Sequence, residues 1–114
     1  MARGYDKHRE RLDEIGRLGK NLARRAKRKC ELCEATDDLR PHDLDPDSEP
    51  TLDTLVLLCE RCRAVADGRR DDPRTLRFLE GAVWSEVPAA AGLARTLVAE
   101  VDADWARNTL ELFG

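Results

Sequence analysis

The four cysteines of the 114-residue chain stand in two pairs, Cys30-Glu-Leu-Cys33 and Cys59-Glu-Arg-Cys62, with 25 residues between the pairs. Two residues between paired thiolates let both sulfurs point at one ion, and zinc takes four such ligands. The pattern therefore predicts one tetrahedral Zn²⁺ site. Because catalytic zinc usually keeps an open position, a site closed by four thiolates is expected to be structural. A disulfide framework and four unrelated buried thiols are the alternatives.

A cationic run, Arg24-Arg25-Ala26-Lys27-Arg28-Lys29, stands directly before the first cysteine pair. Residues 1–29 carry 11 Lys+Arg and 4 Asp+Glu, a net charge of +7, whereas residues 30–114 carry 9 and 19, a net charge of −10. A basic arm before an acidic body predicts binding of DNA or RNA. The expected contact residues are Arg24, Arg25, Lys27, Arg28 and Lys29. Packing on the acidic body, a solvated arm and a protein partner are the alternatives.

One helix is expected to carry the basic arm. From Asp6 to Lys29, apolar residues recur at steps of three and four, which places them on one side of a helix. Gly16 and Gly19 each weaken its middle by about 1 kcal/mol relative to alanine, which predicts a bend or fraying there. The apolar stripe consists of Leu12, Ile15, Leu18, Leu22 and Ala26.

The segment between the cysteine pairs is predicted to form a hairpin. Residues 39–44 read as a short edge strand interrupted by Pro41. Residues 55–58, Leu-Val-Leu-Leu, read as a buried strand that delivers Cys59 to a helix, which Gly68 can cap. A knuckle, a hairpin and a helix in this order are typical of a treble-clef or zinc-ribbon-like finger.

The last third of the chain is predicted to be helical. Pro73 and Pro88 each stand in the first turn of an expected helix, and Asp102 or Asp104 is expected to cap a third. Both tryptophans of the chain are interpreted as core anchors rather than as stacking groups for a ligand. The apolar face of the first of these helices consists of Leu76, Leu79, Val83 and Trp84.

The predicted fold class is a small α+β zinc domain with three segments: a basic N-terminal helix at 1–29, a four-cysteine zinc finger at 30–68 and a helical subdomain packed on the finger at 69–114. The N-terminus lacks the apolar run of a signal peptide, and no stretch approaches the roughly 20 apolar residues of a membrane span. A cytoplasmic protein without membrane contact is therefore expected. No small-molecule substrate is evident.

Five stretches occur in an order that resembles the N-terminal zinc-binding domain of PhnA-type proteins, a family named after an alkylphosphonate-utilisation operon: "KCELCEATDDL", "LVLLCERC", "VWSEVPA", "ARTL" and "DWARNTLEL". The resemblance covers roughly residues 24–112 and is most specific in "WSEVPA" and the tryptophan-containing segment that follows. It implies the same four-cysteine zinc site without a defined activity. Relative to that family, the SH3-like domain that commonly follows is expected to be missing, and residues 1–23 are expected to be additional.

The stretches "CELCEATDDLRPHDLDP" and "LDTLVLLCERC" also resemble the scaffold of HNH endonucleases. In that family a hairpin histidine acts as general base beside a metal ligand, which implies roles for His42 and Asp43. Asp53 or Thr54 holds the family's asparagine position, and Arg63 stands where a final histidine is usual. Because this set is incomplete, the chain is expected to have no catalytic residues. A degenerate or active metal-dependent endonuclease using His42 and Asp43 is the alternative.

Overall fold

The computed structural model describes residues 3–69 and 71–113, and of residues 3–8 it describes the backbone alone. Within this part of the chain there are five α-helices, two short 3-10 helices and one two-stranded sheet, which confirms the small α+β class. The predicted start of the first segment, at residue 1, and the predicted end of the last segment, at residue 114, lie outside the described residues. The elements are α1 (Arg3–Arg25), β1 (Arg40–Asp43), η1 (Leu52–Thr54), β2 (Leu55–Leu58), α2 (Glu60–Ala66), η2 (Pro73–Leu76), α3 (Leu79–Ala82), α4 (Pro88–Val98) and α5 (Asp104–Glu111).

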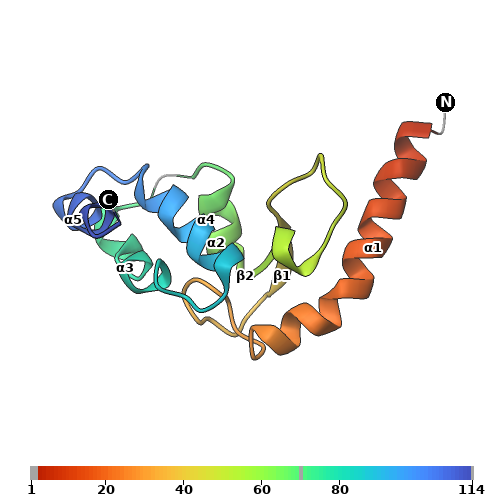
Figure 1. Ribbon diagram of the computed structural model, residues 1–114, viewed down its shortest axis with the longest axis horizontal. Coiled ribbons are helices and arrows are strands. Elements are labelled where there is room, and N and C mark those ends of the chain that lie inside the picture. Colours follow the sequence, from red (N-terminus) through yellow and green to blue (C-terminus); the bar gives the residue numbers. More distant parts are fainter. Residues whose placement is uncertain (1–2, 70, 114) are drawn as a thin grey trace.

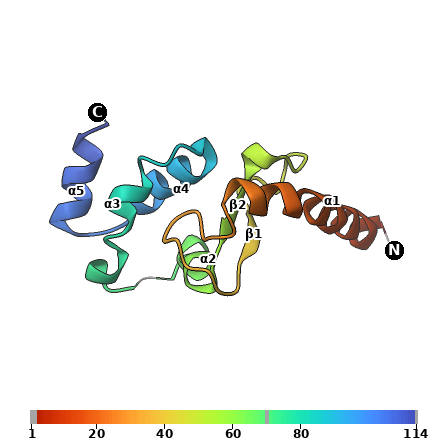
Figure 2. The same ribbon diagram turned by 90° about the horizontal axis from the view of Figure 1, so that it is seen from below.

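Strand β2 is the centre of the fold. It pairs antiparallel with β1, with Arg40 opposite Leu58. Successive side chains of a strand point to opposite faces, yet all four residues of β2 are buried. Val56 and Leu58 belong to one hydrophobic cluster, and Leu55 and Leu57 belong to another. Figures 1 and 2 show the reason, because the sheet lies between α1 on one side and helices α2 to α5 on the other.

Helix α1 packs its inner face on the second of these clusters. Leu22 is fully buried there together with Leu55 and Leu57, and Ile15 and Leu18 pack against the same group. These contacts use the apolar stripe that the three- and four-residue spacing predicts. The C-terminal half of α1 is therefore part of the domain.

The N-terminal half of α1 extends beyond the sheet. The helix is unbroken through Gly16 and Gly19, so the predicted fraying is not observed, although Figure 1 shows its axis turning toward the sheet in the C-terminal half. Leu12, the first residue of the predicted stripe, is 54% exposed. The apolar stripe is thus covered from Ile15 onward, where it packs on the cluster of Leu22, Leu55 and Leu57.

Helix α1 ends at Arg25 rather than at Lys29 as predicted. Lys27 and Arg28 have positive φ angles of 57° and 59°, and the N–H of Arg28 donates to the C=O of Ala23 (2.9 Å). This six-residue closure is a Schellman cap, in which glycine usually takes the left-handed position that lysine occupies here. The cap turns the chain away from the helix axis and back toward the sheet.

The C-terminal helices share one core with the cysteines. Cys30 and Cys62 are in the same buried cluster as Leu79 of α3 and Val98 of α4. Helix α4 begins at Pro88 as predicted, and its buried side consists of Ala90, Ala91, Ala94, Leu97 and Val98. Three of these five residues are alanines, and the side chains at a helix contact set the distance between the helices.

Trp84 is not a core anchor, because it is 58% exposed. The predicted continuous helix is divided into η2 and the short α3, which ends with Val83 as its C-cap. Trp84 therefore lies past the last turn instead of on the buried face. Trp105, by contrast, packs against the main core as predicted.

Neither of the two aspartates expected to cap the last helix does so. The N-cap of α5 is Ala103, which makes no side-chain cap hydrogen bond. Asp102 and Asp104 instead accept hydrogen bonds from Arg107 at 2.8 and 2.7 Å. The negative charges still lie near the positive end of the helix dipole, where they are favourable. No helix in the described ranges is both long and apolar enough to cross a bilayer.

Candidate metal centre

The four cysteine sulfurs come together at one point. Their Sγ atoms lie within 4.8 Å of one another, and those of Cys33 and Cys59 are 3.6 Å apart. All four are free thiols; Cys33 is half-buried and the others are buried. Since a disulfide requires about 2.05 Å between sulfurs, the geometry is that of a ligand cluster. The tetrad can bind a metal ion.

The first pair is shaped by a tight turn. The N–H of Cys30 donates to the C=O of Ala35 (2.7 Å), and the N–H of Glu34 donates to the C=O of Cys30 (2.9 Å). Glu34 has a φ of 67°, in the left-handed region that such a turn requires. The backbone thereby folds around Cys33 and brings its sulfur next to that of Cys30.

The second pair lies where β2 passes into α2. Cys59 is the N-cap of α2, and Cys62 is in its first turn. The guanidinium of Arg63 donates from Nη1 to the C=O of Leu58 and to the C=O of Asp38, both at 2.7 Å. Arg63, which stands at the final-histidine position of the nuclease resemblance, thus braces the end of the strand against the turn before β1.

Glu31, between the first two cysteines, joins the metal centre to both β2 and α1. Its N–H donates to the C=O of Leu57, and its carboxylate accepts from the N–H of Leu57, both at 2.8 Å. The carboxylate also accepts from Nε and Nη2 of Arg25 (3.0 and 2.9 Å), while Arg25 donates to the carbonyls of Leu52 and Leu55. The Glu31 side chain is only 2% exposed. Arg25 therefore holds the centre together and faces inward, unlike the surface role expected for it.

The thiols are unequal before metal binding. A hydrogen bond from the Cys62 thiol lowers the pKa of Cys30 to about 4. The same bond, burial and the charge on Cys30 raise the pKa of Cys62. Burial raises the pKa of Cys33. Four clustered thiolates repel one another strongly, so a cation is needed to stabilise the fully deprotonated tetrad.

His42 and Asp43 do not join this centre. His42 is half-buried on β1, opposite Val56. Asp43 accepts from Nε and Nη2 of Arg11 (2.7 and 3.1 Å), and this bond lowers the pKa of Asp43. Asp53 is exposed on η1. Among the residues whose side chains are described, the cysteine tetrad is the single group of three or more potential ligands close enough to share an ion.

The predicted nucleic-acid contacts divide into two kinds. Arg24, Lys27, Arg28 and Lys29 are exposed, whereas Arg25 is bound to Glu31. Three further exposed cations of α1 were not among the predicted contacts, which came from the continuous run alone: Arg9, Arg17 and Lys20. Their helical spacing relative to Arg24 is the sequence signal that would have found them.

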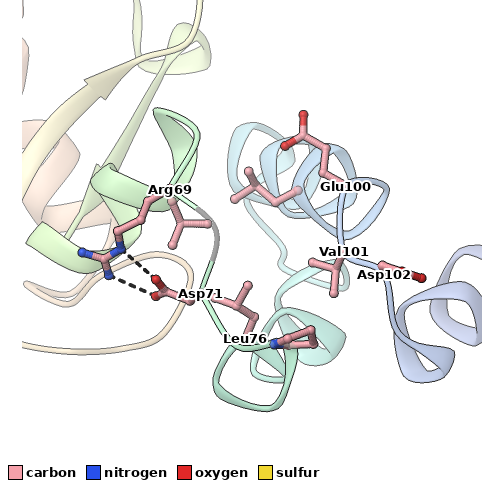
Figure 3. Close-up of a pocket in the computed structure, with 9 residues that line it drawn as sticks. Arg69, Asp71, Leu76, Glu100, Val101 and Asp102 are labelled. Atoms are coloured by element: carbon pink, nitrogen blue, oxygen red, sulfur yellow. Dashed lines mark hydrogen bonds and ion pairs between the residues drawn. The ribbon is translucent and has the colours of Figure 1, made fainter.

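A separate apolar pocket of about 200 Å³ lies between the end of α2, η2 and the end of α4. Figure 3 shows the Arg69–Asp71 pair on one side of it and Glu100 and Asp102 on the other. Asp71 is bound to Arg69 at 2.8 and 3.0 Å, and Asp102 is bound to Arg107. With these carboxylates engaged, the described residues that line the pocket present no set of polar groups directed at a ligand.

Comparison of the chain with protein-family models, with curated proteins and with solved structures finds no match. The geometry of the cysteine tetrad and of the basic helix is therefore the basis for a functional assignment.

Proposed function

We propose that this protein is a zinc-stabilised treble-clef domain of PhnA-like type, without catalytic activity, that binds nucleic acid through the outward face of α1. The observation that carries the binding role is the division of α1 into two faces: one is fixed to the body, and the other presents cations to solvent. The four-thiolate centre makes the domain rigid enough to hold that face in place.

Zinc is the metal that best suits the tetrad. A tetrahedron with Zn–S bonds of about 2.3 Å has sulfurs about 3.8 Å apart, close to the 3.6 Å between Cys33 and Cys59. Soft thiolates in a set of four favour zinc or iron–sulfur clusters over hard cations such as Mg²⁺. Three of the ligands are buried, and the described residues add no fifth ligand to the group, which fits a structural ion.

The order of elements supports the treble-clef assignment. A knuckle supplies Cys30 and Cys33, the β1–β2 hairpin follows, and α2 begins at the second cysteine pair. Cys30 and Cys33 thus come from the turn before β1, and Cys59 and Cys62 come from the start of α2. The PhnA-type assignment rests on the sequence motifs that surround these elements.

The outward face of α1 has the geometry of a phosphate-binding surface. At about 100° per residue, Arg9, Arg17, Lys20 and Arg24 fall within an arc of about 80° and span about 22 Å. All four are exposed, and none has an ion-pair partner among the residues whose side chains are described. Between Arg9 and Arg24, one carboxylate, Asp13, lies in the same arc. The packed residue Leu22 points to the opposite side.

Charge removal on this face tests the proposal. The triple variant Arg17→Gln, Lys20→Gln and Arg24→Gln should bind labelled DNA and RNA of mixed sequence more weakly. It should also lower the magnitude of the slope of log Kd against log salt by about 2 to 3, because each phosphate contact contributes about 0.9. Fluorescence anisotropy at several salt concentrations measures both. Asp13→Asn should strengthen binding. Deleting residues 1–29 is a poorer test, because it removes Leu22 from a core cluster.

A matched control removes three exposed arginines of the body. Arg40, Arg74 and Arg77 have side chains that are 71%, 89% and 66% exposed, and their replacement by glutamine changes net charge by the same amount. This control should leave the salt slope nearly unchanged. Equal losses in both triple variants would mean that α1 has no special role, and absence of binding by the wild-type protein would refute the function.

No observation favours the nuclease alternative. Asp43 is held by Arg11, and Arg63 is used to brace the finger. The proposal is accordingly for a binding domain.

A further inference from the structure

Trp84 is an exposed aromatic side chain that does not belong to the buried core or to the cysteine tetrad. Its ring stacks on Phe113, with centroids 4.6 Å apart and planes inclined by 27°. The guanidinium of Arg95 lies 4.7 Å from the centre of the Phe113 ring. One face of Trp84 is thus covered by Phe113, which Arg95 contacts in turn, yet Trp84 remains 58% exposed. The indole therefore presents an aromatic platform that a stacking contact holds in place.

A hollow of about 390 Å³ lies beside this platform. Trp84 lines it together with Phe78, Cys33 and Ser85. Phe78 is itself backed by Arg61, whose guanidinium lies 4.7 Å from the ring centre. The chain has only five aromatic residues, and three of them lie at this hollow or directly behind it. Such a concentration of supported rings is suited to planar ligands.

A second hollow, of about 360 Å³, adjoins the first. The two share Glu31, Glu34 and Ser85 as lining residues, and the second reaches Lys27 and Lys29. The fold therefore joins aromatic rings from near α3 to cations from the end of α1, although Trp84 and Lys29 are 55 positions apart in the sequence. The common boundary is the knuckle that carries Cys30 and Cys33.

We propose that these two hollows form a binding groove for single-stranded nucleic acid, in which a base stacks on Trp84 while the strand's phosphates contact Lys27 and Lys29. The proposal rests on the proposed nucleic-acid function and specifies its ligand. Aromatic platforms that alternate with cations are the hallmark of single-strand binding, because unpaired bases offer their faces. Bases within a duplex are stacked on one another and cannot reach Trp84.

Two exposed carboxylates, Glu34 and Glu86, also line the groove. They repel phosphates, so a bound strand must pass its backbone on the lysine side of the second hollow. They would instead attract an arginine-rich peptide, whose guanidinium groups also stack on aromatic rings. Replacing both by glutamine should therefore strengthen binding of a nucleic acid and weaken binding of an arginine-rich peptide.

The test compares Trp84→Ala, Trp84→Phe and the control Leu112→Ala, which removes an apolar side chain of similar exposure (67%) elsewhere on the surface. The probes are labelled oligothymidylate and oligouridylate of about 12 nucleotides and a duplex of equal length. Trp84→Ala should weaken single-strand binding roughly 5- to 100-fold, and Trp84→Phe should retain most of it. Leu112→Ala should have no effect, and duplex binding should not respond to Trp84→Ala. Comparison of the two strands shows whether DNA and RNA are equivalent.

Further variants distinguish failure of the groove from failure of the proposed function. Lys27→Gln with Lys29→Gln should weaken binding of the single strand, whereas Glu34→Gln with Glu86→Gln should strengthen it. If single strands bind Trp84→Ala as tightly as wild type while the α1 charge variant loses affinity, the groove is refuted and the proposed function stands. If no nucleic acid binds to any form, both are refuted. Tight binding of an oligoarginine peptide that is lost in the Glu34/Glu86 variant would also overturn the groove's assignment.

Discussion

Two neighbouring arginines show how strongly side-chain direction decides the role of a residue. Arg24 and Arg25 are adjacent and chemically identical, but successive side chains of a helix point about 100° apart. Arg24 is exposed, whereas Arg25 donates four hydrogen bonds, two of them to the buried carboxylate of Glu31. The sequence identifies both as cations near a metal site and cannot assign them to opposite faces unless the helix phase is known.

Replacement of Arg25 by glutamine should destabilise the protein by about 2–3 kcal/mol. The substitution leaves the Glu31 carboxylate, only 2% exposed, without its charge partner, and a buried unpaired charge is costly. Arg24→Gln should change the free energy of unfolding by less than about 0.5 kcal/mol, as is usual for a surface site. Urea denaturation of the metal-loaded protein measures both. In a Glu31→Gln background the cost of Arg25→Gln should fall, and equal costs in the two backgrounds would contradict the pairing.

At the scale of elements, local patterns locate the helices and strands well but not their ends. Residues 55–58 are a buried strand and Pro88 begins a helix, both as predicted. The end of α1 at Arg25 was missed because nothing between Ala26 and Lys29 is a helix breaker. Tertiary contacts end the helix there: the chain must turn so that Glu31 can bond to β2. The exposure of Trp84 was missed for a similar reason, since the division between η2 and α3 has no clear signal in the sequence.

The left-handed cap of α1 predicts opposite outcomes for one kind of substitution at two lysines. Lys27→Gly should stabilise the protein by about 1 kcal/mol, because glycine adopts a φ near 57° without the strain that an L-residue carries. Lys20→Gly, in the middle of the same helix, should destabilise it by about 1 kcal/mol. Thermal unfolding of both variants gives the comparison. Destabilisation by Lys27→Gly would contradict a left-handed conformation at Lys27.

At the scale of the whole molecule, the cysteine tetrad and the two sides of the sheet form one connected structure. The convergence of the four cysteines could be predicted from sequence, because two residues between paired cysteines is the spacing typical of ligands that share one ion. The connections around them could not, since Arg11 reaches Asp43 and Glu31 reaches Leu57 across 32 and 26 residues. Each predicted segment is thereby tied to another one: α1 to the finger through Arg25, and the C-terminal helices to the finger through the shared core.

Removal of the proposed zinc ion should therefore unfold the entire described domain in one step. A structural zinc site contributes on the order of 10 kcal/mol, which equals the total stability of a typical domain. Amide hydrogen exchange after addition of a chelator should show protection at Leu22 of α1 and at Ala94 of α4 lost together, because both residues are fully buried on opposite sides of β2. Metal analysis of the untreated protein should find about one zinc ion per chain. Persistent protection at Ala94 in the metal-free protein would show instead that the C-terminal helices fold independently, and that the zinc ion stabilises the finger and α1 alone.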